Sequence, residues 1–155
     1  MLAVIQRVFS ATVYADGERC GDIGQGLYVL LGVEAEDTPT DADLLAEKLH
    51  KLRIFCDGGG KMNLSSDDVG AELLTVSNFT LCANYAHGNR PDYLWAARPE
   101  VAEPLYTYFT ERCRQHFKRV ETGRFGADMR TDMSTDGPVT IVINSKILSK
   151  KQGQK

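Results

Sequence analysis

Three β-rich stretches follow one another within the first 33 residues, and this succession limits the possible folds more than any other feature of the chain. Residues 4–14 are rich in β-branched side chains, and Asp16-Gly17 offers the positive φ angles of a two-residue hairpin turn. Residues 18–23 then form the expected return strand, and residues 27–33 are apolar enough for a strand buried on both faces. The chain is therefore expected to begin as a β-meander.

Two helices are expected in the rest of the chain. Residues 38–41 combine an N-cap threonine, a proline at the first helical position and an aspartate in the first turn. Apolar residues then recur at helical spacing as far as Leu52, where the first helix should end. The second helix is expected to start around Val101, because Pro104 is tolerated only in a first helical turn. Its predicted buried stripe consists of Val101, Leu105, Tyr108, Phe109, Cys113, Phe117 and Val120.

Further strands are expected after the first helix. Two of them flank the turn Asp57-Gly58-Gly59-Gly60, the next is a long apolar strand, and the last two close the chain. The expected ranges are 53–56, a strand from about 61, 71–81, 126–134 and 139–144. Strands outnumber helices without a regular βαβ alternation, so we expect an α+β fold: a single domain with one mixed sheet and two main helices.

Composition restricts the class of protein. A chain of 155 residues with 43% hydrophobic content can bury a sizeable core in one domain without metals or disulfides. No apolar run approaches the ~20 residues of a membrane helix, and the N-terminus lacks the basic and apolar regions of a secretory signal, so a cytoplasmic protein without membrane contact is expected. The cysteines form no CxxC pair, which predicts reduced thiols rather than a zinc or redox site. They are Cys20, Cys56, Cys82 and Cys113.

The charge distribution along the chain is uneven. The chain contains 18 basic and 21 acidic residues, and four of the basic ones lie in residues 145–155, which contain no acid. Residues 1–144 therefore carry 14 basic against 21 acidic residues, and such an acidic body is a poor general surface for nucleic acid. The Lys-rich tail is either an RNA-contacting arm or, in the interpretation that we favour, a flexible solubilising end.

Two short segments carry most of the functional signal: residues 77–81, Ser-Asn-Phe-Thr-Leu, and residues 136–140, Asp-Gly-Pro-Val-Thr. Each places small or hydroxyl-bearing residues next to an apolar strand, so the chemistry that they support rests mainly on backbone N–H groups, backbone carbonyls and shape. The polar connection from about 82 to 98 is longer than most loops, and loops of this length are often functional. These features favour a site built from backbone groups.

Other sites suggested by residue type are weaker. Cys82 and His87 flank the long loop and would suit a thiol hydrolase, but no acid nearby in sequence orients the imidazole. Cys113 and His116 are spaced for a metal or a nucleophile–base pair on the second helix, where packing against the core is favoured. Residues 57–61 resemble a phosphate loop only faintly, and a hairpin turn is favoured. The basic cluster that ends the second helix either complements the helix dipole or forms an RNA patch. It consists of Arg112, Arg114, Lys118 and Arg119.

Several short segments occur in an order that is typical of one protein family. They read AVIQRV, GLYVLLGVE, LRIF followed by GKMNLS, SNFTL, NRPDY, VETGRFGADM and DGPVT. Taken together they resemble the D-aminoacyl-tRNA deacylases, formerly called D-tyrosyl-tRNA deacylases, over residues 1–144. One departure is Asn78, where the family usually has glutamine, one methylene longer. The retained Gly-Pro core at 137–138 favours the main branch of the family over a related animal branch.

This resemblance implies an enzyme that hydrolyses the ester bond between a D-amino acid and the 3′ end of tRNA, with mischarged glycine as a further substrate. It also implies a barrel-like curvature of the sheet and a homodimer, with neither a cofactor nor a metal. By similarity, Gly137-Pro138 of one subunit, joined by a cis peptide bond, enters the pocket of the partner. Such a wall would clamp the α-amino group and leave no room for an L side chain. The pocket itself would be built from Ser77, Asn78, Phe79 and Thr80.

The chemistry expected at this site needs little from side chains. Backbone N–H groups near Phe79 and Thr80 would stabilise the oxyanion, and water is the expected nucleophile because no general base is evident beside the Thr80 hydroxyl. The resemblance adds the 2′-hydroxyl of the terminal adenosine as an assisting group. Arg7 either holds the Gly-Pro segment through its carbonyls or is an ordinary surface arginine of a strand. Three further residues either line the adenosine pocket or pack in the core, namely Phe125, Gly126 and Met129.

A second hypothesis assigns the chain to another functional class. In this hypothesis it is a non-catalytic, dimeric tRNA-binding module of the same fold, and Asn78 marks a site that has lost activity. Release of only the D-amino acid from charged tRNA would support the enzyme, and binding without turnover would support the module.

Overall fold

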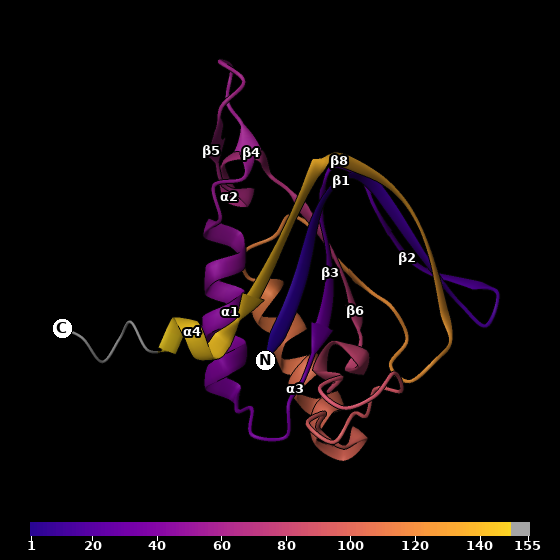
Figure 1. The fold of residues 1–155 in the computed structure, drawn as a ribbon. Coiled ribbons are helices and arrows are strands. Elements are labelled where there is room, and N and C mark those ends of the chain that lie inside the picture. Colours follow the sequence, from indigo (N-terminus) through magenta and orange to yellow (C-terminus); the bar gives the residue numbers. More distant parts are fainter. Residues whose placement is uncertain (150–155) are drawn as a thin grey trace.

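The computed structural model describes residues 1–149, and its central feature is a strongly curved sheet of six strands (Figure 1). These strands are β1 Leu2–Ala15, β2 Glu18–Ile23, β3 Gly26–Gly32, β6 Glu72–Ser77, β7 Val120–Thr122 and β8 Met129–Asn144. β1 pairs antiparallel with β2, β3 and β8, while β6 lies parallel to both β3 and β7. The prediction of a mixed, mostly antiparallel sheet with barrel-like curvature is therefore confirmed.

Two substantial helices cover one face of this sheet. α1 (Pro39–Lys51) and α3 (Pro99–Cys113) pack against each other beside the sheet (Figure 1). The larger cluster of buried side chains contains residues of both helices and of the sheet. The expected α+β class with two main helices is confirmed for residues 1–149. None of the helices in this part of the chain is long and apolar enough to cross a membrane. The shorter elements are α2 Ser66–Val69, α4 Ser145–Ser149, the 3-10 helix η1 Phe79–Cys82, and the two-stranded sheet of β4 Phe55–Cys56 and β5 Met62–Leu64.

The curvature of the sheet originates in β1. This strand is 14 residues long, and its register with β8 shifts on either side of Val8. Irregularities of this kind bend a strand and increase its twist. Because of the bend, β1 contributes to two separate clusters of buried side chains: Ala3 and Ile5 lie beneath the helices, whereas Val8 and Val13 lie in the curve of the sheet with residues of β2, β3 and β6.

The long apolar strand expected over 71–81 is shorter than predicted. β6 ends at Ser77, and η1 follows almost directly. The reason is local, because Asn78 occupies the N-cap position of η1 and its side-chain oxygen accepts a hydrogen bond from the Thr80 N–H at 3.2 Å. Asparagine favours such caps over strand interiors. The chain therefore turns at the point where the apolar pattern alone indicated a continuing strand.

The second main helix begins earlier than predicted. α3 starts at Pro99, which takes the first helical position, and Pro104 lies inside the helix. The predicted buried stripe is wrong at Val101 and Tyr108, which are exposed, while Tyr106 is buried. The Tyr108 hydroxyl donates to a carboxylate of α1, with oxygen–oxygen distances of 3.1 and 3.3 Å, and this contact holds the ring at the surface.

The two C-terminal strands predicted over 126–134 and 139–144 form one continuous strand, β8. It pairs antiparallel with β1 along almost the whole length of that strand. The Gly137-Pro138 peptide bond within β8 is cis. Within residues 1–149 β1 is the one sheet partner of β8, so the other edge of β8 is free. A free edge suits a proline, which has no N–H to donate to a neighbouring strand.

The first part of the predicted flexible tail is helical. Ser145 is buried at the start of α4, its N–H donates to the Met1 carbonyl at 2.9 Å, and its hydroxyl donates to an Asp41 oxygen at 2.8 Å. These contacts tie α4 to the beginning of β1 and to α1, so residues 145–149 pack on the domain. The other three lysines of the predicted tail fall within residues 150–155, which lie outside the described residues.

Candidate active site

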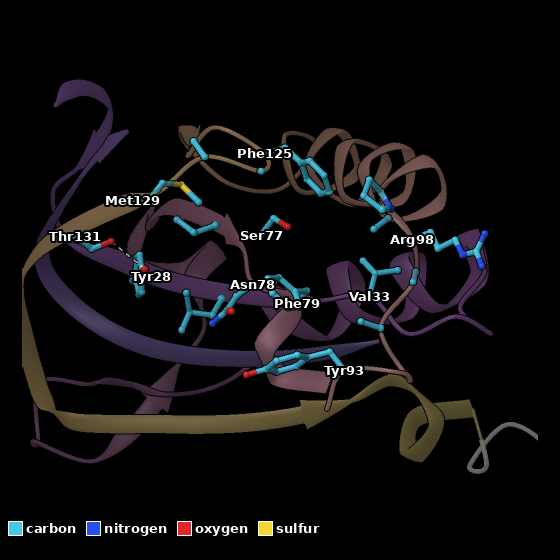
Figure 2. A pocket seen from close by; sticks show the side chains of 18 residues that line it. Tyr28, Val33, Ser77, Asn78, Phe79, Tyr93, Arg98, Phe125, Met129 and Thr131 are labelled. Atoms are coloured by element: carbon cyan, nitrogen blue, oxygen red, sulfur yellow. Dashed lines mark hydrogen bonds between the residues drawn. The ribbon is translucent and has the colours of Figure 1, made fainter. Parts of the chain in front are cut away.

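A cavity of about 710 Å³ opens where β3 and β6 run toward η1, and most of its wall is apolar (Figure 2). The wall comes from β3, the junction of β6 and η1, the loop before α3, the first turn of α3, and the connection from β7 into β8. A volume of this size accommodates a ligand of several rings. Apolar side chains of the wall include Leu30, Val33, Val76, Phe79, Phe125 and Met129.

Two groups of residues predicted from the sequence meet at this cavity. Residues 77–79 line it at the end of β6. The second group, from the connection between β7 and β8, consists of Phe125, Gly126 and Met129. The four other predicted site residues do not line the cavity in the described part of a single chain. They are Arg7, Thr80, Gly137 and Pro138.

The end of β6 presents a hydroxyl and a backbone donor to the cavity. Among residues 1–149 the Ser77 hydroxyl and the Phe79 N–H have no hydrogen-bond acceptor, and Figure 2 shows the Ser77 side chain within the cavity. The Thr80 N–H is already used, because it donates to Asn78 Oδ1 at 3.2 Å, and the Thr80 hydroxyl donates to the same oxygen at 2.5 Å. Of the two backbone donors expected to stabilise an oxyanion, the Phe79 N–H is therefore the free one.

The cavity contains very few titratable side chains. Its described lining residues include no aspartate, glutamate, histidine, lysine or cysteine, and Arg98 is the one residue among them with a formal charge. Burial raises the pKa of Tyr28, so its hydroxyl is neutral at physiological pH. This hydroxyl lies 3.1 Å from the Thr131 hydroxyl. The cavity thus offers hydrogen-bond donors and one cation, but no side chain suited to act as a general base at neutral pH.

Sequence reasoning missed four polar or aromatic residues of the wall, namely Tyr28, Tyr93, Arg98 and Thr131. Tyr93 packs edge-on against Phe79, with ring centroids 5.0 Å apart, and so closes one side of the cavity. Tyr93 and Arg98 belong to the long connection that the sequence marked as a candidate functional loop. The pattern did not indicate which loop residues turn back toward β6, because that depends on tertiary contacts.

Arg7 holds the residue that precedes the Gly137-Pro138 pair. Its side chain is buried, and it forms an ion pair with Asp136 in which Nε lies 2.9 Å from Oδ2 and a terminal nitrogen lies 3.1 Å from Oδ1. It also donates to the Ile54 carbonyl. Arg7 is therefore not a surface arginine, and among residues 1–149 it binds the carboxylate that precedes Gly137-Pro138. Contact of Arg7 with the carbonyls of that pair stays a prediction. Gly137 and Pro138 themselves are exposed.

The thiols do not support a cysteine hydrolase. Cys82 is buried, and burial together with the nearby Glu34 and Asp37 raises the pKa of its thiol from 9.0 to about 11. Burial also raises the pKa of Cys113, which packs in the core. Both thiols are protonated at neutral pH and are poor nucleophiles. The alternative site at Cys82 and His87 is therefore not favoured, since neither residue lines the cavity.

The basic residues at the end of α3 are mostly engaged by acids and carbonyls. Arg112 Nε lies 2.7 Å from an Asp43 oxygen, and Arg114 donates to Glu111 and to the Val120 carbonyl. Arg119 donates to the Asp22 carbonyl on β2. These contacts favour a structural role for the cluster over an RNA patch.

Comparisons with known sequences agree on one family. The sequence model of the D-Tyr-tRNA(Tyr) deacylase family matches residues 4–144. A D-aminoacyl-tRNA deacylase of Dehalococcoides mccartyi strain BAV1 is 49% identical over 146 residues, which cover 94% of this chain and 95% of the relative. A protein of the same name from Escherichia coli O81 is 50% identical over 140 residues, which cover 90% of this chain and 97% of the relative.

Solved structures of similar proteins share the fold over most of the chain. The c-Myc DNA unwinding element binding protein has a TM-score of 0.87 and 40% identity, and the match covers 93% of this chain and 98% of that one. A probable eukaryotic D-amino acid tRNA deacylase has a TM-score of 0.80 at 15% identity and covers 92% of this chain and 97% of its own. The second likeness supports the fold alone.

Proposed function

Because the chain belongs to the D-Tyr-tRNA(Tyr) deacylase family, we propose that it is a D-aminoacyl-tRNA deacylase, a hydrolase that proofreads charged tRNA. It cleaves the ester bond between a D-amino acid and the 3′ end of tRNA, in the cytoplasm where translation uses charged tRNA. The observation that carries this proposal is the position of residues 77–79, which form part of the family's motif and line a largely apolar cavity of about 710 Å³. Glycine, which has no side chain to exclude, is a further substrate.

The proposed reaction relies on backbone donors and bound water. Water attacks the ester carbonyl carbon, the bond to the 3′ oxygen breaks, and that oxygen takes up a proton as the tRNA leaves. The Phe79 N–H and the Ser77 hydroxyl are free to donate to the oxyanion that forms on the carbonyl. Since no lining side chain can act as a general base at neutral pH, the substrate's own 2′-hydroxyl is the group proposed to assist the water.

The cavity wall suits the terminal adenosine of tRNA. Phe125 offers an aromatic face on which an adenine ring stacks, and Gly126 and Met129 continue the wall beside it. Arg98 is exposed at the mouth of the cavity, where its guanidinium is available to a backbone phosphate. In this arrangement Phe125 binds the adenine, Arg98 binds the phosphate, and the ester lies near residues 77–79.

We further propose that the active form is a homodimer in which each Gly137-Pro138 pair completes the cavity of the partner. Gly137 and Pro138 are exposed and absent from the cavity of their own chain, while Arg7 anchors the residue before them. Within residues 1–149 β8 has a free edge and, with β1, carries exposed apolar side chains at Phe9 and Val142. Carbonyls of the Gly-Pro pair would bind the α-amino group and leave no space for an L side chain.

Incubation of the purified chain with D-aminoacyl-tRNA tests the catalytic proposal. Release of the free D-amino acid with multiple turnovers supports it. Tight binding of the charged tRNA without ester cleavage would instead support the alternative of a tRNA-binding module that has lost activity at Asn78. Glycyl-tRNA in the same assay tests the proposed second substrate.

A further inference from the structure

A cluster of four polar side chains lies away from the cavity, where α1, α2 and the turn after α3 meet. Glu47 and His50 lie one helical turn apart near the end of α1, Asp67 lies on α2, and His116 follows α3. Figure 1 shows α2 next to the C-terminal end of α1. None of the four residues lines the cavity, so the proposed deacylation gives the cluster no role.

Both ring nitrogens of His50 face a carboxylate. Nδ1 lies 2.7 Å from an Asp67 oxygen, Nε2 lies 3.3 Å from a Glu47 oxygen, and the ring is buried. When Asp67 accepts the Nδ1–H, the neutral ring carries its lone pair on Nε2, directed at Glu47. A lone pair and a carboxylate repel each other, so this arrangement calls for a proton or a metal cation between them.

His116 approaches the same Glu47 oxygen. Its ring stacks on His50 with centroids 3.8 Å apart and an interplanar angle of 3°, and its Nε2 lies 4.0 Å from Glu47 Oε2. Two imidazole rings and one carboxylate, groups that bind divalent metal ions, therefore lie close together here.

We propose that Glu47, His50 and His116 bind one divalent transition-metal ion, with Zn²⁺ the best match to two imidazole nitrogens and one carboxylate oxygen. The three ligand atoms lie within 4.8 Å of one another. Ligands of a tetrahedral zinc ion are ~3.4 Å apart. Because imidazole lone pairs lie in the ring plane, binding requires the partly exposed His116 ring to turn out of its stack on His50, so that its Nε2 points at the ion. Asp67 supports His50 from its far side, as carboxylates do in many zinc sites. Water fills the fourth position.

The bound ion joins two parts of the fold. Glu47 and His50 belong to α1, whereas His116 follows the end of α3, so the ion ties together the two helices that cover the sheet. The unfolded chain does not hold these ligands together, and a ligand that binds only the folded state stabilises it. The proposed role is therefore structural, and Glu47, whose side chain is 53% exposed, gives the ion access from solvent.

Titration of the metal-free protein with Zn²⁺ alone, followed by calorimetry and thermal unfolding, tests this site. We expect one Zn²⁺ per chain and a melting temperature about 5–10 °C higher at free zinc 100-fold above Kd. His116→Ala should abolish both effects, and Asp67→Asn should weaken zinc binding ~10–100-fold. His87→Ala is the matched control, because His87 is the remaining histidine of the chain and is exposed in the loop, so it should bind zinc like the unaltered protein.

Two further measurements separate a loss of metal ligands from misfolding and a histidine site from a thiol site. Glu47→Gln keeps the size of an exposed side chain, so it should fold normally without metal and still lose zinc binding. Co²⁺ in place of Zn²⁺ should give a visible spectrum without a thiolate charge-transfer band, since no cysteine belongs to the site. A thiolate band, zinc binding that survives His116→Ala, or no zinc binding at all would overturn the proposal.

Discussion

The side chain of Asn78 accepts hydrogen bonds from both the N–H and the hydroxyl of Thr80, and this contact shapes the first turn of η1. Asn78 thus orients the adjacent Phe79 N–H, and its neutral amide brings no charge to the proposed reaction centre. The asparagine amide, one methylene shorter than the glutamine usual in the family, fits this cap because its Oδ1 lies close to the backbone N–H of Thr80.

Removal of the Asn78 cap should affect stability and activity together. Asn78→Ala is expected to lower the free energy of unfolding by about 1 kcal/mol and to reduce kcat/KM, because the start of η1 loses its fixed position. Asn78→Asp keeps the acceptor, so its stability should match that of the unaltered chain, but its negative charge beside the oxyanion should still reduce the rate. Urea unfolding and single-turnover deacylation measure the two effects. Equal activity in all three proteins would show that the cap has no part in positioning the site.

The Phe79 N–H is the proposed oxyanion donor, and proline substitution can delete it. Phe79 is the first residue of η1, where proline is tolerated, and Asn78 before it is extended, as a residue preceding proline prefers to be. Phe79→Pro is therefore expected to fold and to lower kcat by ~10²–10³-fold. Phe79→Ala, which keeps the N–H and loses the ring, is the control and should retain most of kcat. Similar kcat losses in both variants would assign the effect to the side chain instead.

At the scale of elements, the hairpin of β1 and β2 and the helix α1 were predictable from the sequence. Asp16-Gly17, the capping residues 38–41 and a regular apolar repeat each specify local structure without help from distant residues. Residues 129–144 were not predictable as one strand, since Gly137-Pro138 looks like a break until β1 is seen to pair on both sides of it. The end of β6 was misplaced because the cap of Asn78 competes with an apolar pattern that continues beyond it.

The candidate site was predictable only where its residues belong to a recognisable segment. Residues 77–79 and the connection that contains Phe125 were identified in this way, and they line the cavity. Tyr28 was not identified from the sequence, because inside an apolar strand no sequence feature indicates which side chain faces a cavity. The partner of Arg7, Asp136, was also missed, since 129 residues separate the two in sequence.

The pairing of Arg7 with Asp136 should position the Gly137-Pro138 segment of β8. Arg7→Met leaves Asp136 without its partner in a partly buried place, so the free energy of unfolding should fall by about 3 kcal/mol. Asp136→Asn keeps one acceptor for Arg7 and should cost less. Both variants should lose more D-aminoacyl-tRNA deacylation than their lower stability accounts for, measured at a temperature where each is fully folded. Full activity in folded Asp136→Asn would contradict a positioning role for the pair.

For the whole molecule, the proposed exchange of Gly137-Pro138 between subunits predicts complementation. Gly137 has a φ of +127°, and a Cβ there would lie 2.5 Å from the Val139 nitrogen. Gly137→Ala should therefore displace the Gly137-Pro138 segment from its position in the partner's cavity. Gly137→Ala and Phe79→Pro are each expected to be nearly inactive. When the two proteins are unfolded and refolded together, half of the dimers are mixed and each has one intact site, so about a quarter of the full activity should return. No recovery would indicate that each site is built within one chain.

The central claim concerns chirality, and the ratio of kcat/KM for D-tyrosyl-tRNA over L-tyrosyl-tRNA, measured on the purified full chain, tests it most directly. A site that excludes L side chains by shape should favour the D ester by ~10³-fold or more, since a rigid clash costs several kcal/mol. A ratio near one, with both esters cleaved, would contradict the account, because the chain would then be an unselective esterase.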